Sequence, residues 1–254
     1  MTDDSGQTPG AVRLRDQVQR SLAFHSGGTG GIERELTLLR RWQAARLART
    51  HADLLQNPRY RPAAEFFLDE LYGDRDFRQR EQELARVVPL MIRILPAPVL
   101  QTAALALELN ALSHELDVRL TQLLVTEFGG GDSLDEAVYV AAYRRCGATE
   151  QRRYQLDLVE RLGRDLQRIV PKRFIHTALK LARRPAQRAG VGELHRFLER
   201  GCCAFQHLGA EAGDFVTTII ARERRIMDQI SAGQSQPLQL EGESGAGNIS
   251  SRCC

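Results

Sequence analysis

Apolar residues recur at helical spacing through most of the chain, and this periodicity limits the fold more than any other feature. The longest uninterrupted example runs from Val99 to Phe128, where Leu105, Leu109, Leu112 and Leu116 form one apolar arc. No run of alternating, β-branched residues of the kind that builds strands is found elsewhere. The sequence therefore predicts an all-α fold.

Helix ends are marked by residues that stop or start a helix. Proline or glycine follows the apolar patterns at Pro58, Gly73, Pro96 and Gly129, as is typical of helix C-termini. These signals divide the middle of the chain into about eight helices. We expect them to pack into a single bundle-like domain over residues 32–231.

The two ends of the chain lack this pattern. Residues 1–31 begin polar, carry a short amphipathic piece from Val12 to Phe24 and end in a glycine cluster over residues 27–31. Residues 232–254 are rich in glycine, serine and glutamine. We therefore expect a flexible N-terminal segment over residues 1–31 and a disordered C-terminal tail over residues 232–254.

Composition narrows the class of protein. The 254 residues carry a formal net charge of +3 and are 43% hydrophobic, which is typical of a globular protein. No apolar stretch approaches the ~18 residues of a membrane span, and no secretory signal pattern is present. The basic residues are nearly all arginine, with Lys172 and Lys180 as the lysines. We predict a cytoplasmic, bacterial protein that does not bind a membrane.

A polar stripe interrupts the apolar face of the longest helical pattern. It consists of Gln101, Glu108, Glu115, Arg119 and Gln122. If that face is buried, two carboxylates are buried with it, which costs several kcal/mol unless they are paired or bind a ligand.

Two interpretations of this stripe remain open. In the structural one, Glu115 pairs with Arg119 four residues later, and Glu108 meets an arginine from a neighbouring helix. In the functional one, Glu108, Glu115 and Arg119 line a ligand pocket or an acid–base site. The opposite face, with Asn110, His114, Asp117 and Thr121, is expected to be solvated.

His51 is the histidine of most interest, because it lies between Leu47 and Leu55 on an apolar helix face. A packed core histidine is the simpler interpretation, and ligand binding is the alternative. The Glu-x-x-His pairs of carboxylate di-metal bundles do not occur. We predict no metal site and no cofactor.

A second candidate region, Pro58 to Phe77, interleaves aromatic and charged residues. Its aromatics fill the core in the simpler interpretation. In the functional one the segment is a surface for a protein partner, with Tyr60, Arg61, Tyr72 and Asp76 as the contact residues.

The same region carries a resemblance. The run FFLDELYGDRDF, from Phe66 to Phe77, resembles the signature Phe-Phe-Leu-x-x-Leu-Tyr-Gly-x-x-Asp-Phe of a family of uncharacterised bacterial helical proteins. The likeness extends from about Trp42 to Asp117. It implies a shared helical fold and a bacterial origin, and it implies no activity and no site residues.

Residues 161–188 contain nine basic residues and one acid, Asp165. Such a segment could follow phosphates, which raises nonspecific nucleic-acid binding. The helix-turn-helix likeness near residue 190 fails, because Arg196 stands where an apolar anchor is needed and Pro185 would disrupt the preceding helix. A solvated arginine face, or a surface for an acidic protein partner, fits this segment better than a nucleic-acid site does.

The sequence thus favours a non-catalytic regulatory or adaptor protein that acts through protein–protein contacts. The alternatives are a helical-bundle small-ligand binder or enzyme that uses the Glu/Arg stripe, and nonspecific nucleic-acid binding through residues 161–188.

Overall fold

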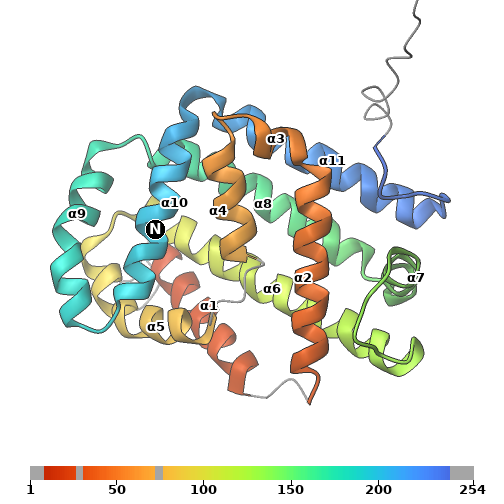
Figure 1. Cartoon of the computed structure of the whole chain (residues 1–254). Coiled ribbons are helices and arrows are strands. Elements are labelled where there is room, and N and C mark those ends of the chain that lie inside the picture. Colours follow the sequence, from red (N-terminus) through yellow and green to blue (C-terminus); the bar gives the residue numbers. More distant parts are fainter. Residues whose placement is uncertain (1–8, 27–30, 72–76, 241–254) are drawn as a thin grey trace, which may run out of the picture.

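Every regular element in the described part of the chain is a helix. The computed structural model describes residues 9–26, 31–71 and 77–240. Its elements are α1 (Pro9–Ser26), α2 (Glu33–Thr50), α3 (Ala52–Gln56), α4 (Arg61–Leu71), α5 (Phe77–Ile94), α6 (Ala97–Glu127), α7 (Glu136–Cys146), α8 (Thr149–Ile169), α9 (Arg173–Arg188), α10 (Gly192–Leu208), the 3₁₀ helix η1 (Gly209–Glu211) and α11 (Ala212–Ala232) (Figure 1). The all-α prediction is confirmed. More helices form than expected, partly because α1 is one of them and His51 separates α2 from α3.

α6 is the central helix of the fold. It is 31 residues long, follows Pro96 and ends at Phe128, before two glycines with positive φ. It packs against α1, α2, α7 and α8, so that helices cover it on several sides. Figure 1 shows it crossing the molecule behind α2 and α4.

The face of α6 that we expected to be solvated is covered by α2. Thr121 is fully buried, and the Asp117 carboxylate accepts a hydrogen bond from Arg40 of α2 at 3.3 Å. The expectation was wrong because it assumed a helix with one buried face, whereas α6 is enclosed. Polar residues on this side meet partners on α2 instead of water.

α1 belongs to the folded domain, unlike the flexible segment expected over residues 1–31. Ala11, Leu14 and Val18 are buried against α5 and α6. Gly10 allows the close approach, because a Cβ there would lie 3.1 Å from Gln101 Cγ and 3.3 Å from the Ala97 carbonyl oxygen. The short amphipathic pattern was enough for a helix because α6 offers it an apolar face.

The chain also remains packed for a few residues after α11. Pro237 is buried, and Leu238 and Leu240 pack against the cluster that contains Leu39 and Tyr139. The expected disordered tail from residue 232 therefore does not describe residues 233–240. Residues 241–254 lie outside the described part of the chain.

Two of the described helices contain a proline beyond their first turn. Pro89 lies within α5, and Pro185 lies within α9, which continues to Arg188. We expected Pro185 to disrupt its helix, since proline removes one backbone hydrogen bond. The helix continues instead, and Pro185 itself is exposed. None of the described helices is long and apolar enough to cross a membrane.

Candidate functional site

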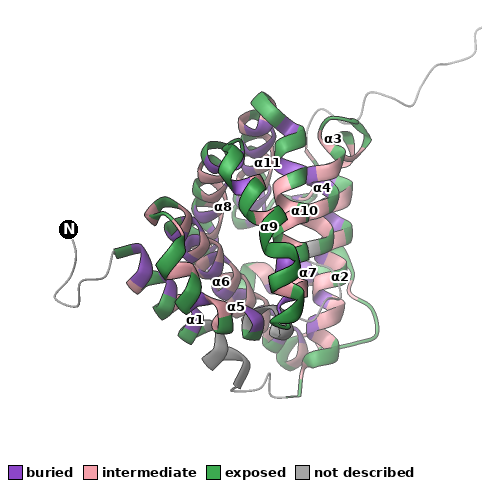
Figure 2. Cartoon of the chain, turned by 90° about the vertical axis from the view of Figure 1, so that its left-hand side faces the viewer, coloured by how far each residue is buried: buried purple, intermediate pink, exposed green. Residues whose placement is uncertain are grey.

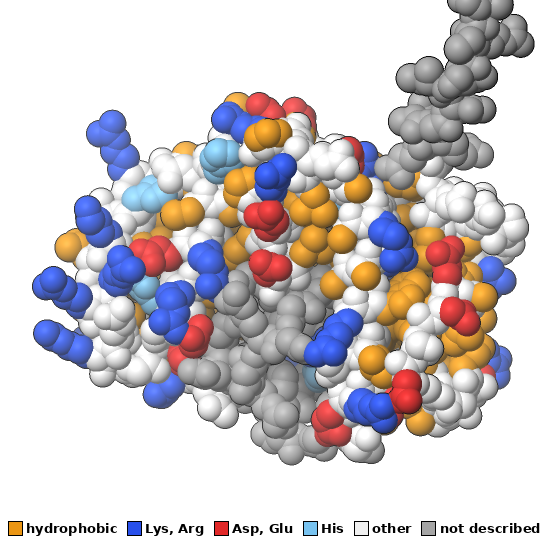
Figure 3. Space-filling view, viewed as in Figure 1, with side chains coloured by type: hydrophobic (Ala, Val, Ile, Leu, Met, Phe, Trp, Pro, Cys, Tyr) orange, Lys and Arg blue, Asp and Glu red, His pale blue; other side chains and the backbone are white. Residues whose placement is uncertain are grey.

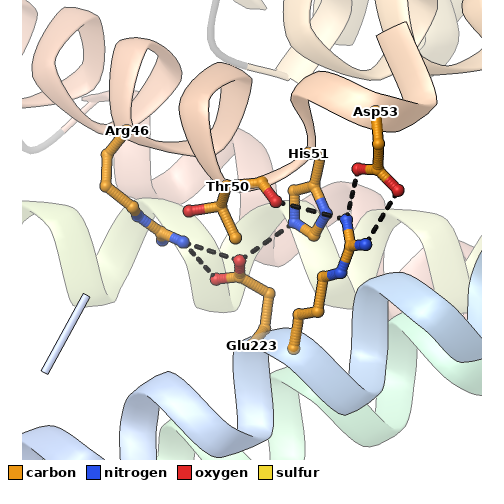
Figure 4. Close-up of polar contacts among 6 residues, drawn as sticks. Arg46, Thr50, His51, Asp53 and Glu223 are labelled. Atoms are coloured by element: carbon orange, nitrogen blue, oxygen red, sulfur yellow. Dashed lines mark hydrogen bonds and ion pairs between the residues drawn. The ribbon is translucent and has the colours of Figure 1, made fainter. Parts of the chain in front are cut away.

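A buried group of charged side chains lies where α2 and α3 meet α11. His51 stands between α2 and α3 with φ −117° and ψ 29°, outside helical geometry. This break turns its ring towards α11, where the ring nitrogen Nε2 lies 3.1 Å from Oε1 of Glu223 (Figure 4). His51 is buried, and Glu223 is the polar partner that a core histidine needs.

Arg46 supplies the charge that balances Glu223. Its Nη1 lies 2.6 Å from both carboxylate oxygens of Glu223. Burial raises the pKa of Glu223, but the charge of Arg46 and the hydrogen bonds from His51 and Arg46 outweigh burial and lower that pKa to about 2. Glu223 is therefore ionised at any physiological pH.

A second ion pair closes the cluster on the solvent side. Arg222 donates to both carboxylate oxygens of Asp53, at 2.6 and 2.8 Å, and to the Thr50 carbonyl at 3.2 Å. The hydrogen bond from Arg222 is the main reason why the pKa of Asp53 lies below its usual value, and burial opposes it. The end of α2 and the start of α3 are thereby fixed to α11.

A further polar layer lies around Asp117 of α6. Burial raises the pKa of Asp117 above its usual value, against the charges of Arg40 and Arg152. The Arg152 guanidinium also lies over the Tyr143 ring, 4.0 Å from its centroid. Burial raises the pKa of Tyr143, and the charges of Arg46 and Glu223 also act on this group. The two polar layers are therefore electrostatic neighbours.

This arrangement holds helices together and leaves a few buried atoms unsatisfied. His51 Nδ1, Gln43 Oε1 and Gln229 Oε1 are buried without a hydrogen-bond partner. A histidine beside a carboxylate has the geometry of a general base and its orienting group. Here both carboxylate oxygens are bound to Arg46, and the second ring nitrogen is buried, so the contacts of the cluster join α2 to α11.

Glu108 lies apart from this cluster, between α1, α6 and α8. It accepts hydrogen bonds from Arg13 of α1 and from the Tyr154 hydroxyl of α8, each at 2.5 Å. Burial raises its pKa, but the bonds from Tyr154 and Arg13 lower it below the usual value. Arg13 also lines a surface hollow of about 310 Å³, together with Gln101 and Arg161.

The predicted polar stripe on α6 is not one site. Glu115 and Arg119 are both partly exposed, and within the described residues the expected ion pair between them is not formed. Glu108 pairs with Arg13 of the neighbouring helix α1, as the structural interpretation expected. His51 pairs with Glu223 in the cluster on α11. The four ligand-binding candidates thus fall into separate places.

The partner-surface candidates that the structure describes have partners within the chain. The Tyr60 ring packs against Phe215, with centroids 5.8 Å apart. Arg61 donates to the Leu55 carbonyl at 2.9 Å, at the end of α3. Tyr72 and Asp76 lie outside the described residues.

Glu223 and Arg46 were not identified from the sequence. Glu223 stands in the charged run Arg222–Arg225, which has the composition of a solvated surface. A signal was nevertheless present: Glu223 lies eight residues after Phe215 and four before Met227, on the apolar face of α11. A carboxylate on that face requires a buried cation opposite it.

Comparison with known proteins gives one family. Residues 25–237 match a family model described as a domain of unknown function (DUF8198). No match is found among curated proteins or solved structures. The matched range begins near the end of α1 and includes every other helix, with all five labelled residues of Figure 4. The chain belongs to the DUF8198 family.

Proposed function

We propose that this protein is a non-catalytic binding protein that acts through contact with another protein, and that α9 carries the contact surface. The observation that supports this proposal is the exposure of α9. Ile175 is the one α9 residue in the buried class. Figure 2 shows α9 facing the viewer and mostly exposed.

An apolar stripe runs along α9 without a neighbour to cover it. It consists of Phe174, Ala178, Leu181, Ala182 and Pro185, all of them exposed. Phe174 is 43% exposed and Leu181 is 72% exposed. Phe174, Ala178, Leu181 and Pro185 follow one another at intervals of three or four, and Ala182 lies four residues after Ala178, so all five lie on one face of the helix. An exposed apolar face of this kind is typical of a protein–protein interface.

The stripe is presented on a fixed support. His195 of α10 donates from its ring Nε2 to the Leu179 carbonyl at 2.8 Å. Arg86 of α5 donates to the Gly190 carbonyl at 3.1 Å, just after α9 ends. A partner would therefore meet a helix that is already folded and oriented, which lowers the entropy cost of binding.

The proposed setting is the reducing cytoplasm of a bacterium. The described cysteines Cys146, Cys202 and Cys203 are free thiols, which fits such a compartment. The arginine-rich composition supports the bacterial source.

The proposal is tested by crosslinking from the stripe and by replacing Leu181, the more exposed of its two large side chains. A photoreactive phenylalanine analogue at Ala182, in cells of the native host, would crosslink the partner for identification and purification. Calorimetry with the purified partner should then give an affinity at least tenfold lower for Leu181→Ser, a loss of about 1.4 kcal/mol.

The matched control is Leu90→Ser. Leu90 lies on α5 and is 57% exposed, so the same substitution there changes surface hydrophobicity without touching α9. The proposal fails if no partner crosslinks, or if Leu181→Ser binds as tightly as the Leu90→Ser control.

A further inference from the structure

The apolar stripe of α9 has a basic edge on one side only. The edge consists of Arg173, Lys180, Arg184 and Arg188, which are exposed. They follow one another at intervals of seven, four and four residues and so run parallel to the stripe. Among the described residues no ion pair to these four is formed, and α9 itself contains no acidic residue.

The other side of the stripe is occupied by the domain itself. Ile175, Leu179 and Ala186 are buried or half-buried on that side, where α9 packs against α10. Figure 3 shows Lys and Arg side chains projecting at the left of the molecule, where Figure 1 places α9. The surface is therefore asymmetric, with α10 along one edge and unpaired positive charge along the other.

Within residues 161–188 the uncompensated positive charge lies mainly on α9, because acidic residues of α8 neutralise part of the positive charge of α8. Arg164 pairs with Glu160 and Arg168 pairs with Asp165 on the same helix. Arg161 lies beside Asp165 at the hollow near α1. The charge that remains available to a partner lies next to the apolar stripe.

Taking α9 as the contact surface of the proposed function, we infer that its partner is an acidic amphipathic helix. Such a helix would lie along α9 with apolar residues on the stripe and Asp or Glu residues against the basic edge. From Arg173 to Arg188 the edge is about 22 Å long, which matches about four turns of a partner helix. Helix-in-groove binding of this kind is anchored at intervals of three and four residues.

Three other occupants fit the asymmetry less well. A second copy of this chain packed antiparallel on α9 would bring the same four cations against one another. A nucleic acid would use the cations but not the apolar stripe, since phosphate contacts are polar. A membrane-surface helix carries its charged residues on both sides of the apolar face, whereas here α10 occupies one side.

The experiment uses the full chain and defined probes. Three fluorescent 18-residue helical peptides share one leucine face and differ at the positions along one edge, which hold Glu, Gln or Lys. Anisotropy at about 0.1 M salt should show the Glu peptide binding at least tenfold more tightly than the Lys peptide. Leu181→Ser and the pair Lys180→Glu/Arg184→Glu should each weaken the Glu peptide at least tenfold.

Arg164→Glu/Arg168→Glu is the matched control, because it makes the same change in net charge on exposed arginines of α8. It should leave Glu-peptide binding within about twofold, since surface charges act mostly within a Debye length of about 10 Å. An equal loss in this control would show a general charge effect and overturn the inference.

The remaining outcomes separate the inference from the proposed function. If all three peptides bind equally and Leu181→Ser abolishes binding, α9 is a contact surface and the acidic partner is wrong. If none of the peptides binds, the inference fails, and the crosslinking experiment decides the proposed function on its own.

The protein is also mixed with vesicles of one anionic to three zwitterionic lipids and with a 20-base-pair DNA duplex. Binding to one of these alone, weakened by Lys180→Glu/Arg184→Glu, would overturn the inference in favour of that ligand. Self-association by light scattering that Leu181→Ser abolishes would overturn it in favour of a second copy.

Discussion

At the scale of single residues, the cluster around Glu223 shows how charge is kept inside a helical domain. Its carboxylate is bound by Arg46 and faces His51, so burial is offset by one full positive charge and directed hydrogen bonds. A buried ion pair adds little to the free energy of unfolding compared with apolar residues in its place. Removing one partner is costly, because it leaves the other charge buried without compensation. The cluster therefore makes the contact between α2 and α11 specific to these side chains.

Glu223→Gln should lower the free energy of unfolding by about 3 kcal/mol, because it removes the buried carboxylate that balances the charge of Arg46. Urea denaturation followed by circular dichroism measures this loss. Glu150→Gln is the matched control, since Glu150 pairs with Arg153 and its side chain is 84% exposed. The control should cost less than about 0.5 kcal/mol, and equal losses in the two variants would contradict the prediction.

Residue-level sequence reasoning found His51 but not its partners. A single histidine among leucines is conspicuous, and its burial followed from that pattern. Glu223 was hidden because its three neighbours in the chain are arginines, and the side of α11 that is buried depends on α2, which is far away in sequence. An arginine partner for Glu108 was expected, but its identity as Arg13 was not, because Arg13 lies in a segment that was not expected to fold.

At the scale of elements, periodicity predicts that helices form but not how many sides of a helix are covered. The bounds of α6 lie close to the Val99 to Phe128 pattern expected from glycine, proline and apolar spacing. The covered face of α6 was misjudged because the sequence of one helix does not show how many neighbours it has. α1 was missed because its stability depends on α5 and α6 more than on its own sequence.

Leu14→Ala tests whether α1 is part of the cooperative core. Leu14 is fully buried, so its truncation should cost about 2–4 kcal/mol if α1 unfolds together with the domain. Thermal and urea unfolding of the full chain measure this cost. Gln19→Ala, on the exposed side of the same helix, should change stability by less than about 0.5 kcal/mol. An unchanged stability in Leu14→Ala would mean that α1 detaches before the domain unfolds.

At the scale of the whole molecule, the polar cluster joins parts of the chain that are far apart in sequence. Arg46 and Glu223 are separated by 177 positions. The cluster can form only when the last helix docks on the first long helix of the matched family range. Contacts of such long sequence separation cost loop-closure entropy, so we expect this docking to complete the domain.

Stability of the whole molecule should fall in acid. Because the pKa of Glu223 is lowered to about 2 from 4.5, its contribution is present above pH 4.5 and is lost as pH falls towards 2. Asp53 and Glu108 act in the same direction. Asp117 acts in the opposite direction, because its pKa is raised and its contribution is lost as pH rises.

The measurement is urea unfolding of the native protein and of Glu223→Gln at pH 7, 5 and 3. The difference in stability between the two proteins should shrink as pH falls, because a protonated Glu223 resembles the glutamine. A difference that stays constant from pH 7 to pH 3 would show that Glu223 does not carry the acid dependence.

The stacking of the single tryptophan on Tyr139 has a practical consequence. The two rings lie with centroids 4.0 Å apart, in the cluster that also holds α7 and the segment after α11. Fluorescence excited at the red edge of the absorption band comes from Trp42 and therefore reports on this end of the domain alone. Events at α9 and α10 leave this emission unchanged. A change in Trp42 emission would therefore report the docking of the segment that follows α11.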